Sequence, residues 1–194
     1  MNGLNLNQLP SLKMLVIKIW RSNCIALIFS LFAFHTAQGQ QIYINEFMAS
    51  NGTTISYEIG DFDDWVELYN PGSTAIDIGG MYLSDDPIDP LVWQIPTTDP
   101  ASTTIPAGGF LLLWLDKETT QGPLHIDVKL GSGGEDIILT AANGTTTIDS
   151  YTFGTQLEDV SEGRLGDGNA GYFLCHNQHI IYFFIPSILK CKVA

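Results

Sequence analysis

Two groups of carboxylates are the residues in this chain whose type and spacing most readily support chemistry. They are Asp61, Asp63 and Asp64 in one short segment and Asp85, Asp86 and Asp89 in another. Hard cations such as Ca²⁺ take oxygen ligands from Asp side chains and backbone carbonyls with flexible geometry. We therefore predict these residues as a candidate calcium site, with calcium as the one possible cofactor. The spacing is not that of an EF-hand loop, so solvated loops without an ion are the alternative.

Catalytic chemistry has little support between residues 40 and 174. His125 is the single histidine there, and beside a Pro-Leu loop we expect it at the surface rather than as a general base. The three cysteines, Cys24, Cys175 and Cys191, all lie outside this interval, so it contains no thiolate nucleophile or cysteine zinc site. We expect no catalytic residues and no enzyme activity.

A candidate binding surface follows the first acidic group. After Asp64 the residues alternate, which predicts a strand with Val66 and Leu68 on one face. The opposite face carries Trp65, Glu67 and Tyr69. We expect this second face to be partly exposed, as part of a surface for a protein or as an aromatic platform for a glycan.

Short strands must position these groups, because turn residues interrupt the apolar segments at close intervals. The apolar run 110–115 lacks alternation, which predicts a central strand buried on both faces. Asn143-Gly144 predicts a hairpin between two later strands. Further strands are expected near 42–48, 63–69, 75–78, 81–83, 91–95, 124–130, 136–140 and 145–151. The chain is therefore predicted to be all-β, a sandwich of about eight or nine short strands.

The two ends of the chain differ from this middle part. Residues 1–39 combine basic residues, an apolar stretch and Ala37-Gln-Gly39, which predicts a signal peptide cleaved before Gln40. Residues 40–174 form the predicted domain. Residues 175–194 contain no acidic residue and no glycine, so we interpret them as an atypical tail, disordered or out of frame. A change of reading frame near Leu174 would make the chain part of a longer protein.

The charge of the chain restricts its partners. All 21 acidic residues lie between Glu46 and Asp167, where the basic residues are Lys117, Lys129 and Arg164. Such a surface repels phosphate backbones, so we expect no binding to nucleic acid. We expect contact with a membrane only through the signal peptide before its cleavage, and secretion or display at the cell surface.

Five motifs in one order resemble the lamin-tail domain family, over roughly residues 40–173. They are Ile44-Asn-Glu-Phe-Met48, Asp64-Trp-Val-Glu-Leu-Tyr-Asn-Pro71, Ile78-Gly-Gly-Met-Tyr-Leu-Ser-Asp-Asp86, Trp93-Gln-Ile-Pro96 and Ile105-Pro-Ala-Gly-Gly-Phe-Leu-Leu113. The pattern is most similar to the bacterial, secreted branch. The resemblance implies an immunoglobulin-like β-sandwich that serves as an interaction module and not as a catalyst.

Besides a purely structural role in the cell envelope, two functions remain open from the sequence. The first is a non-catalytic binding or adhesion module, secreted or at the cell surface, whose partner is a protein or an extracellular glycan. The second is the accessory N-terminal fragment of a larger secreted enzyme, because bacterial domains of this family are commonly joined to hydrolases, nucleases or spore-coat-kinase-like proteins.

Overall fold

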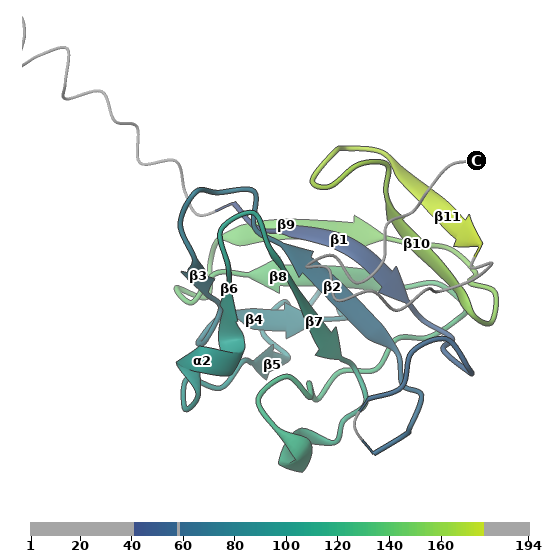
Figure 1. Cartoon of the computed structure of the whole chain (residues 1–194), viewed down its shortest axis with the longest axis horizontal. Coiled ribbons are helices and arrows are strands. Elements are labelled where there is room, and N and C mark those ends of the chain that lie inside the picture. The colour runs from purple at the N-terminus through teal and green to yellow at the C-terminus, as the bar shows by residue number, and fades with distance from the viewer. Residues whose placement is uncertain (1–40, 58, 177–194) are drawn as a thin grey trace, which may run out of the picture. The chain divides into compact units, whose positions relative to one another are not determined.

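The structure, a computed structural model, describes residues 41–57 and 59–176 as two main antiparallel sheets and one small one. The first main sheet has five strands in the order β11-β10-β1-β2-β7, and the second has four in the order β5-β4-β8-β9. Figure 1 shows the two sheets as layers, with β3 and β6 forming a separate pair at one end. Antiparallel sheets stacked in this way form a β-sandwich.

The five-stranded sheet contains most of the long strands. Its members are β1 (Tyr43–Met48), β2 (Trp65–Tyr69), β7 (Phe110–Trp114), β10 (Val160–Arg164) and β11 (Tyr172–His176). The pairing of β1 with β2 shifts register between Ile44 and Glu46, which marks a β-bulge.

The remaining elements form the second sheet, the small pair and two short helices. The second sheet contains β4 (Tyr82–Ser84), β5 (Trp93–Gln94), β8 (Asp136–Thr140) and β9 (Thr147–Thr152). The small pair is β3 (Ile76–Asp77) with β6 (Thr104–Ile105). A one-turn helix, α2 (Pro100–Thr103), and a 3₁₀ turn, η2 (Thr119–Gln121), lie in connections.

The main hydrophobic core lies between the two large sheets. Val66 and Leu68 of β2 belong to it together with Leu83 of β4 and Leu139 of β8, and all four are fully buried. A second, smaller cluster contains Met48, Tyr57, Trp65 and Trp114. Since side chains alternate along a strand, this cluster lies on the outer face of the five-stranded sheet, the face turned away from the other sheet.

The predicted all-β sandwich is confirmed, with eleven strands among the described residues, eight of them three residues or longer. Three details of the prediction are wrong. The apolar run 110–115 forms β7 at an edge of the sheet and not a central strand. The run is apolar because one of its faces packs on the main core and the other on the outer cluster, and this does not require a strand on each side. The segment 124–130 makes only an isolated bridge, between His125 and Trp114, and three strands were not predicted, namely β6, β10 and β11.

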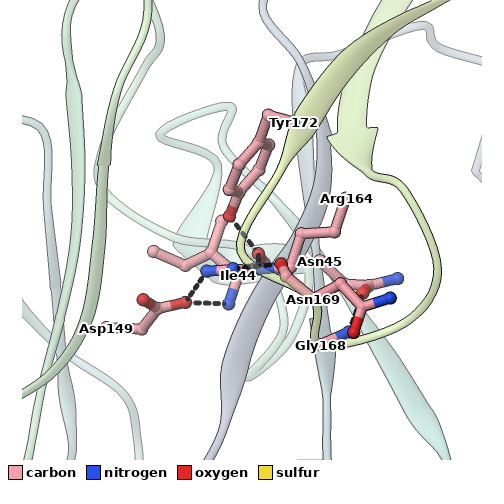
Figure 2. A network of polar contacts seen from close by, with 7 residues as sticks. All are labelled: Ile44, Asn45, Asp149, Arg164, Gly168, Asn169 and Tyr172. Atoms are coloured by element: carbon pink, nitrogen blue, oxygen red, sulfur yellow. Dashed lines mark hydrogen bonds and ion pairs between the residues drawn. The ribbon is translucent and has the colours of Figure 1, made fainter.

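Arg164 joins the two large sheets at the bulge in β1. Its Nη2 lies 2.7 Å from Asp149 Oδ2 of β9, and its Nε donates to the carbonyl oxygen of Ile44, 2.9 Å away. Ile44 N donates to the same carboxylate oxygen of Asp149, and Tyr172 Oη donates to the Ile44 carbonyl. Figure 2 shows these contacts, which join residues of β1, β9, β10 and β11. The network fixes the bulge of one sheet against the other.

The flanking segments are described only in small part. The predicted signal peptide, 1–39, lies outside the described residues, as does the predicted tail from residue 177 onward. Strand β11 continues through Cys175 and His176, which pair with Ser161 and Val160, two residues past the predicted end of the domain. Within 41–57 and 59–176, the structure contains no helix of a length and apolarity suited to crossing a membrane.

Candidate binding pocket

A pocket of about 300 Å³ lies where the connection between β1 and β2 meets two later loops. Three short segments and one single residue line it: 49–52, 62–64, 129–132 (without Gly131) and Glu158. The sequence forms a loop here because Asn51-Gly52-Thr53-Thr54 follows β1 with turn-forming residues. The pocket is therefore assembled on the rigid end of the five-stranded sheet.

Asn51 holds the β1–β2 connection in shape. Its side-chain amide donates to the carbonyl oxygens of Ile55 (2.7 Å) and Asp63 (2.8 Å), and its Oδ1 accepts from Thr54 N (3.1 Å). Asn51 is 7 % exposed, so these hydrogen bonds are shielded from water. A buried side chain that bonds both arms of a loop restricts its movement, and the pocket wall is preorganised.

Asp159 holds the loop before β10 against the β1–β2 connection. Its carboxylate accepts hydrogen bonds from Gly52 N (2.7 Å), Thr53 N (2.8 Å) and Thr54 Oγ1 (3.1 Å). Its side-chain hydrogen bond with Thr53 contributes most to holding its pKa below the ordinary value. Asp159 has φ of 58°, a left-handed conformation that turns the chain and places Glu158 at the pocket.

Asp64 is the least exposed acidic residue of the pocket. It is 9 % exposed, and Asn51 N approaches its Oδ1 at 3.4 Å, beyond the usual length of a strong hydrogen bond. Among the described residues, none donates a hydrogen bond to Asp64 Oδ2 or forms an ion pair with this carboxylate. Burial raises the pKa of Asp64 to about 6, and the Asn51 hydrogen bond and Lys129 oppose this rise.

The remaining charges of the pocket are unbalanced. Asp63 and Glu158 add two carboxylates, and Lys129 contributes one ammonium group that makes no ion pair within the described part of the chain. Burial, followed by the charge of Asp116, raises the pKa of Asp63, while Lys129 lowers it. Phe62, 42 % exposed, gives one wall an apolar surface. The pocket thus combines net negative charge with an apolar wall.

Of the two predicted acidic loops, only the first contributes residues to the pocket. Asp63 and Asp64 line the pocket, whereas the exposed Asp61 does not, and neither does any residue of the second loop. In that loop Asp86 Oδ1 accepts from Ile88 N and Asp89 Oδ1 from Leu91 N, which are local turn contacts. Asp85 is half-buried. Over 41–57 and 59–176, no three His, Cys, Asp or Glu side chains gather in a way that could hold a metal ion.

The expected exposure of the strand face with Trp65 and Glu67 is wrong. Trp65 is fully buried in the outer cluster, and Glu67 is 1 % exposed and accepts a hydrogen bond from Asn45 Nδ2 (2.9 Å). Tyr69 is partly buried and stacks on Phe110, with ring centroids 4.7 Å apart. The alternation was correctly assigned, but the β1–β2 connection covers Trp65 with Tyr57. Trp65 therefore offers no surface for stacking on a sugar.

The expected surface position of His125 is also wrong. His125 is 5 % exposed, and its Nδ1 forms a short contact with Asp116 Oδ2. Its ring lies edge-on to Tyr57, with centroids 4.8 Å apart. Asp116 and His125 thus form a buried pair beside the outer cluster. The parallel bridge of His125 with Trp114 positions this pair, and the short segment around His125 had given no sign of it.

The fold is that of an all-β, immunoglobulin-like β-sandwich with a preorganised surface pocket at one end of its five-stranded sheet. The model of the Lamin Tail Domain family matches residues 35–155, more than half of the chain. The chain therefore belongs to the lamin-tail domain family, a family of non-catalytic, immunoglobulin-like domains. Neither a curated protein nor a solved structure gives a match.

Sequence reasoning found Asp63 and Asp64 but missed the other charged residues of the pocket. Lys129 and Ser132 were assigned to a strand and a turn, and Glu158 to no site. These residues lie about 65 to 95 positions from the acidic segment, and no local pattern links them to it. The nearest signal was Asp159, since Asp tolerates the left-handed conformation that bends the chain here.

Proposed function

We propose that this chain is a non-catalytic binding module, secreted or displayed at the cell surface, and that the pocket around Asp64 is its binding site. The observation that carries the proposal is a nearly buried carboxylate that lines a preorganised open pocket and forms no ion pair with any described residue. Folded proteins seldom leave a buried charge uncompensated, because its desolvation is costly. Sites of this kind occur where a ligand supplies the missing partner.

The charge of the domain supports an extracellular protein as partner and argues against nucleic acid. The described domain carries an excess of carboxylates, and the pocket repeats this excess locally. Electrostatic complementarity would steer a basic surface toward it and repel phosphate. Function would then lie in loops held by a rigid sheet, as in other modules of sandwich architecture.

Binding can be tested with an array of peptides and extracellular glycans of acidic, neutral and basic character. We expect the ligands that bind to lose affinity for a protein with Asp63→Asn and Glu158→Gln. The matched control is Asp86→Asn with Asp89→Asn, which removes two charges from the other acidic loop. If a ligand binds the pocket variant and the control variant with the same affinity, this would contradict the pocket as the binding site.

Secretion needs its own test. We expect protein recovered from the medium or cell surface to begin at Gln40, as N-terminal sequencing would show. Protein that keeps residues 1–39 would contradict a cleaved signal peptide.

Calcium, the cofactor predicted from the acidic loops, is tested by thermal unfolding. A resident ion would make the melting temperature fall on addition of a chelator and rise with added Ca²⁺, because a ligand that binds only the folded state stabilises it. A melting temperature that does not respond to the chelator would remove calcium from consideration.

A further inference from the structure

The pocket around Asp64 has features that specify the chemistry of its ligand more closely than a binding module does. This step rests on the proposed function, since it concerns the same pocket. From the arrangement of acceptors, apolar wall and rim, we infer that the pocket receives a lysine side chain of a partner protein, with the ammonium group against Asp64.

The first feature is the nearly buried carboxylate. Asp64 is nine-tenths buried, and its Oδ2 accepts no hydrogen bond from the described residues. A cationic donor at this oxygen would form a charge-assisted hydrogen bond in a site partly shielded from water, where such bonds are strong. Lys129, which is exposed and makes no described ion pair, does not fill this place.

The second feature is the distribution of the acceptors. Asp64 presents one free oxygen, because Asn51 N lies against the other, and further oxygens come from Asp63, Ser132 and Glu158 on separate segments. An ammonium group has three donors on a compact centre, which suits single oxygens placed around it. A guanidinium group favours two parallel oxygens of one carboxylate. The arrangement therefore favours lysine over arginine.

The third feature is the apolar material at and near the pocket. Phe62 and Leu130 line it, and Phe62 is 42 % exposed. Leu157, 55 % exposed, directly precedes the lining residue Glu158 in the chain. A lysine side chain has a long apolar stem that packs on such groups while its charged end reaches a polar partner. Apolar neighbours of the lysine in the partner would contact the exposed part of Phe62 and Leu157.

A metal ion is a poorer fit to the same pocket. Among the described residues, no three carboxylate, histidine or cysteine side chains converge closely enough to coordinate one. Ca²⁺ needs six to eight oxygen ligands at short range, whereas an ammonium group is satisfied by about three hydrogen-bond acceptors. An organic cation such as an ammonium group therefore needs fewer converging oxygens than a metal ion.

The test uses three capped peptides that differ at one position, with a lysine, an arginine or an acetyl-lysine between two leucines. Acetylation keeps the stem and removes the charge. Binding to the ¹⁵N-labelled full chain is followed by NMR. We expect the lysine peptide to shift the amide signals of Asn51, Gly52 and Ser132. The arginine peptide should bind several-fold more weakly, and the acetyl-lysine peptide about tenfold or more weakly, as the loss of one charged hydrogen bond implies.

Variants connect this binding to the proposed residues. Asp64→Asn keeps an oxygen for Asn51 N and should lower the affinity for the lysine peptide about tenfold or more. Glu158→Gln alters an exposed side chain of the pocket and should lower the affinity several-fold. Asp86→Asn, on the other acidic loop, should leave it unchanged. Because the Glu158 side chain is exposed, we expect Glu158→Gln to keep the fold, so the test does not depend on the stability of Asp64→Asn.

Several results would overturn the inference. Equal binding of the lysine and acetyl-lysine peptides would show that charge is not recognised. Tighter binding of the arginine peptide would replace lysine by a guanidinium ligand. If none of the three peptides shifts the signals of the pocket, a basic ligand is refuted. The proposed function is then tested separately by the array of peptides and glycans, where it holds if a ligand of another class binds and loses affinity for the protein with Asp63→Asn and Glu158→Gln.

Discussion

Glu46 allows a quantitative test of the outer face of the five-stranded sheet, because its carboxyl group is almost completely buried. Glu46 is 2 % exposed, and the residue paired with it in β2 is also a glutamate, Glu67. Burial is the main reason that the pKa of Glu46 rises from 4.5 to about 7. The hydrogen bond from Ser161 Oγ (2.5 Å) lowers this pKa, and the charge of Asp167 raises it further.

The sign of the resulting pH dependence follows from the two protonation states. Below pH 4.5 Glu46 is protonated in both the folded and the unfolded protein, and the neutral carboxyl contributes its full stability. Between 4.5 and about 7 the unfolded state loses this proton first, so the free energy of unfolding falls as pH rises. At about 1.4 kcal/mol per pH unit, the loss over this window is about 3 kcal/mol.

Glu46→Gln isolates this contribution, because glutamine does not ionise and its Oε1 can still accept from Ser161. We expect the free energy of unfolding of the variant, minus that of the wild type, to increase by about 3 kcal/mol between pH 4.5 and a pH above 7. Urea denaturation at a series of pH values measures both proteins. A constant offset caused by the new amide group does not affect this change with pH.

The control is Glu118→Gln, which removes the same charge at an exposed position. Its difference from the wild type should change little over the same pH range, because solvent-exposed charges contribute little to stability. A pH-independent difference for Glu46→Gln would refute the reasoning, since it would mean that Glu46 ionises in the folded protein as readily as in the unfolded chain.

Three further substitutions test other parts of the fold. Arg164→Met should lower the free energy of unfolding by about 3 kcal/mol, since it leaves the Asp149 carboxylate without its cation. Arg164→Lys should recover only part of this loss in urea denaturation, because it lacks the planar fork, and full recovery would contradict the importance of the network. Gly134→Ala should cost about 1 to 3 kcal/mol, because Gly134 has φ of 111° and a Cβ there would lie 2.8 Å from the carbonyl oxygen of the residue after β9. Gly133→Ala, with no atom within 4 Å, is the control, and equal losses for the two would exclude backbone strain. Tyr57→Phe should raise the melting temperature, because the buried Tyr57 hydroxyl has no hydrogen-bond partner among the described residues, and a lower melting temperature would reveal one.

The strands were predictable where local patterns decide them. Alternation placed Val66 and Leu68 correctly on the core face of β2, and Asn143-Gly144 marked the β8–β9 hairpin, where Gly144 has φ of 67°. What alternation leaves open is whether the second face is covered. The β1–β2 connection folds over Trp65 and brings Tyr57 onto it, and this depends on contacts with Asn51 that no period in the sequence expresses.

The position of a strand within its sheet was harder to predict for a related reason. An apolar run indicates that both faces are covered, and it does not count the strands on either side. The run 110–115 meets the inner core through Leu113 and the outer cluster through Trp114, yet β7 pairs along its length with β2 alone. On its open side the segment around His125 supplies a short bridge, with Ile126 N donating to the Trp114 carbonyl at 2.8 Å.

The pocket was predicted only in part, because only one of its walls comes from a short segment whose sequence pattern can be recognised. The acidic residues before β2 had to end in a loop at the start of a buried strand, and Asp64 sits at that boundary. The opposite wall depends on Asp159, whose left-handed backbone and hydrogen bonds to Gly52 and Thr53 bring Glu158 across more than 90 positions of sequence. A side chain at Gly52 would lie 2.6 Å from Glu158 Oε1, so the small residue and the hydrogen bonds of Asp159 belong to one arrangement. Asp64 could thus be predicted from the boundary of β2 alone, whereas the pocket around it forms only when the fold brings the distant loops together.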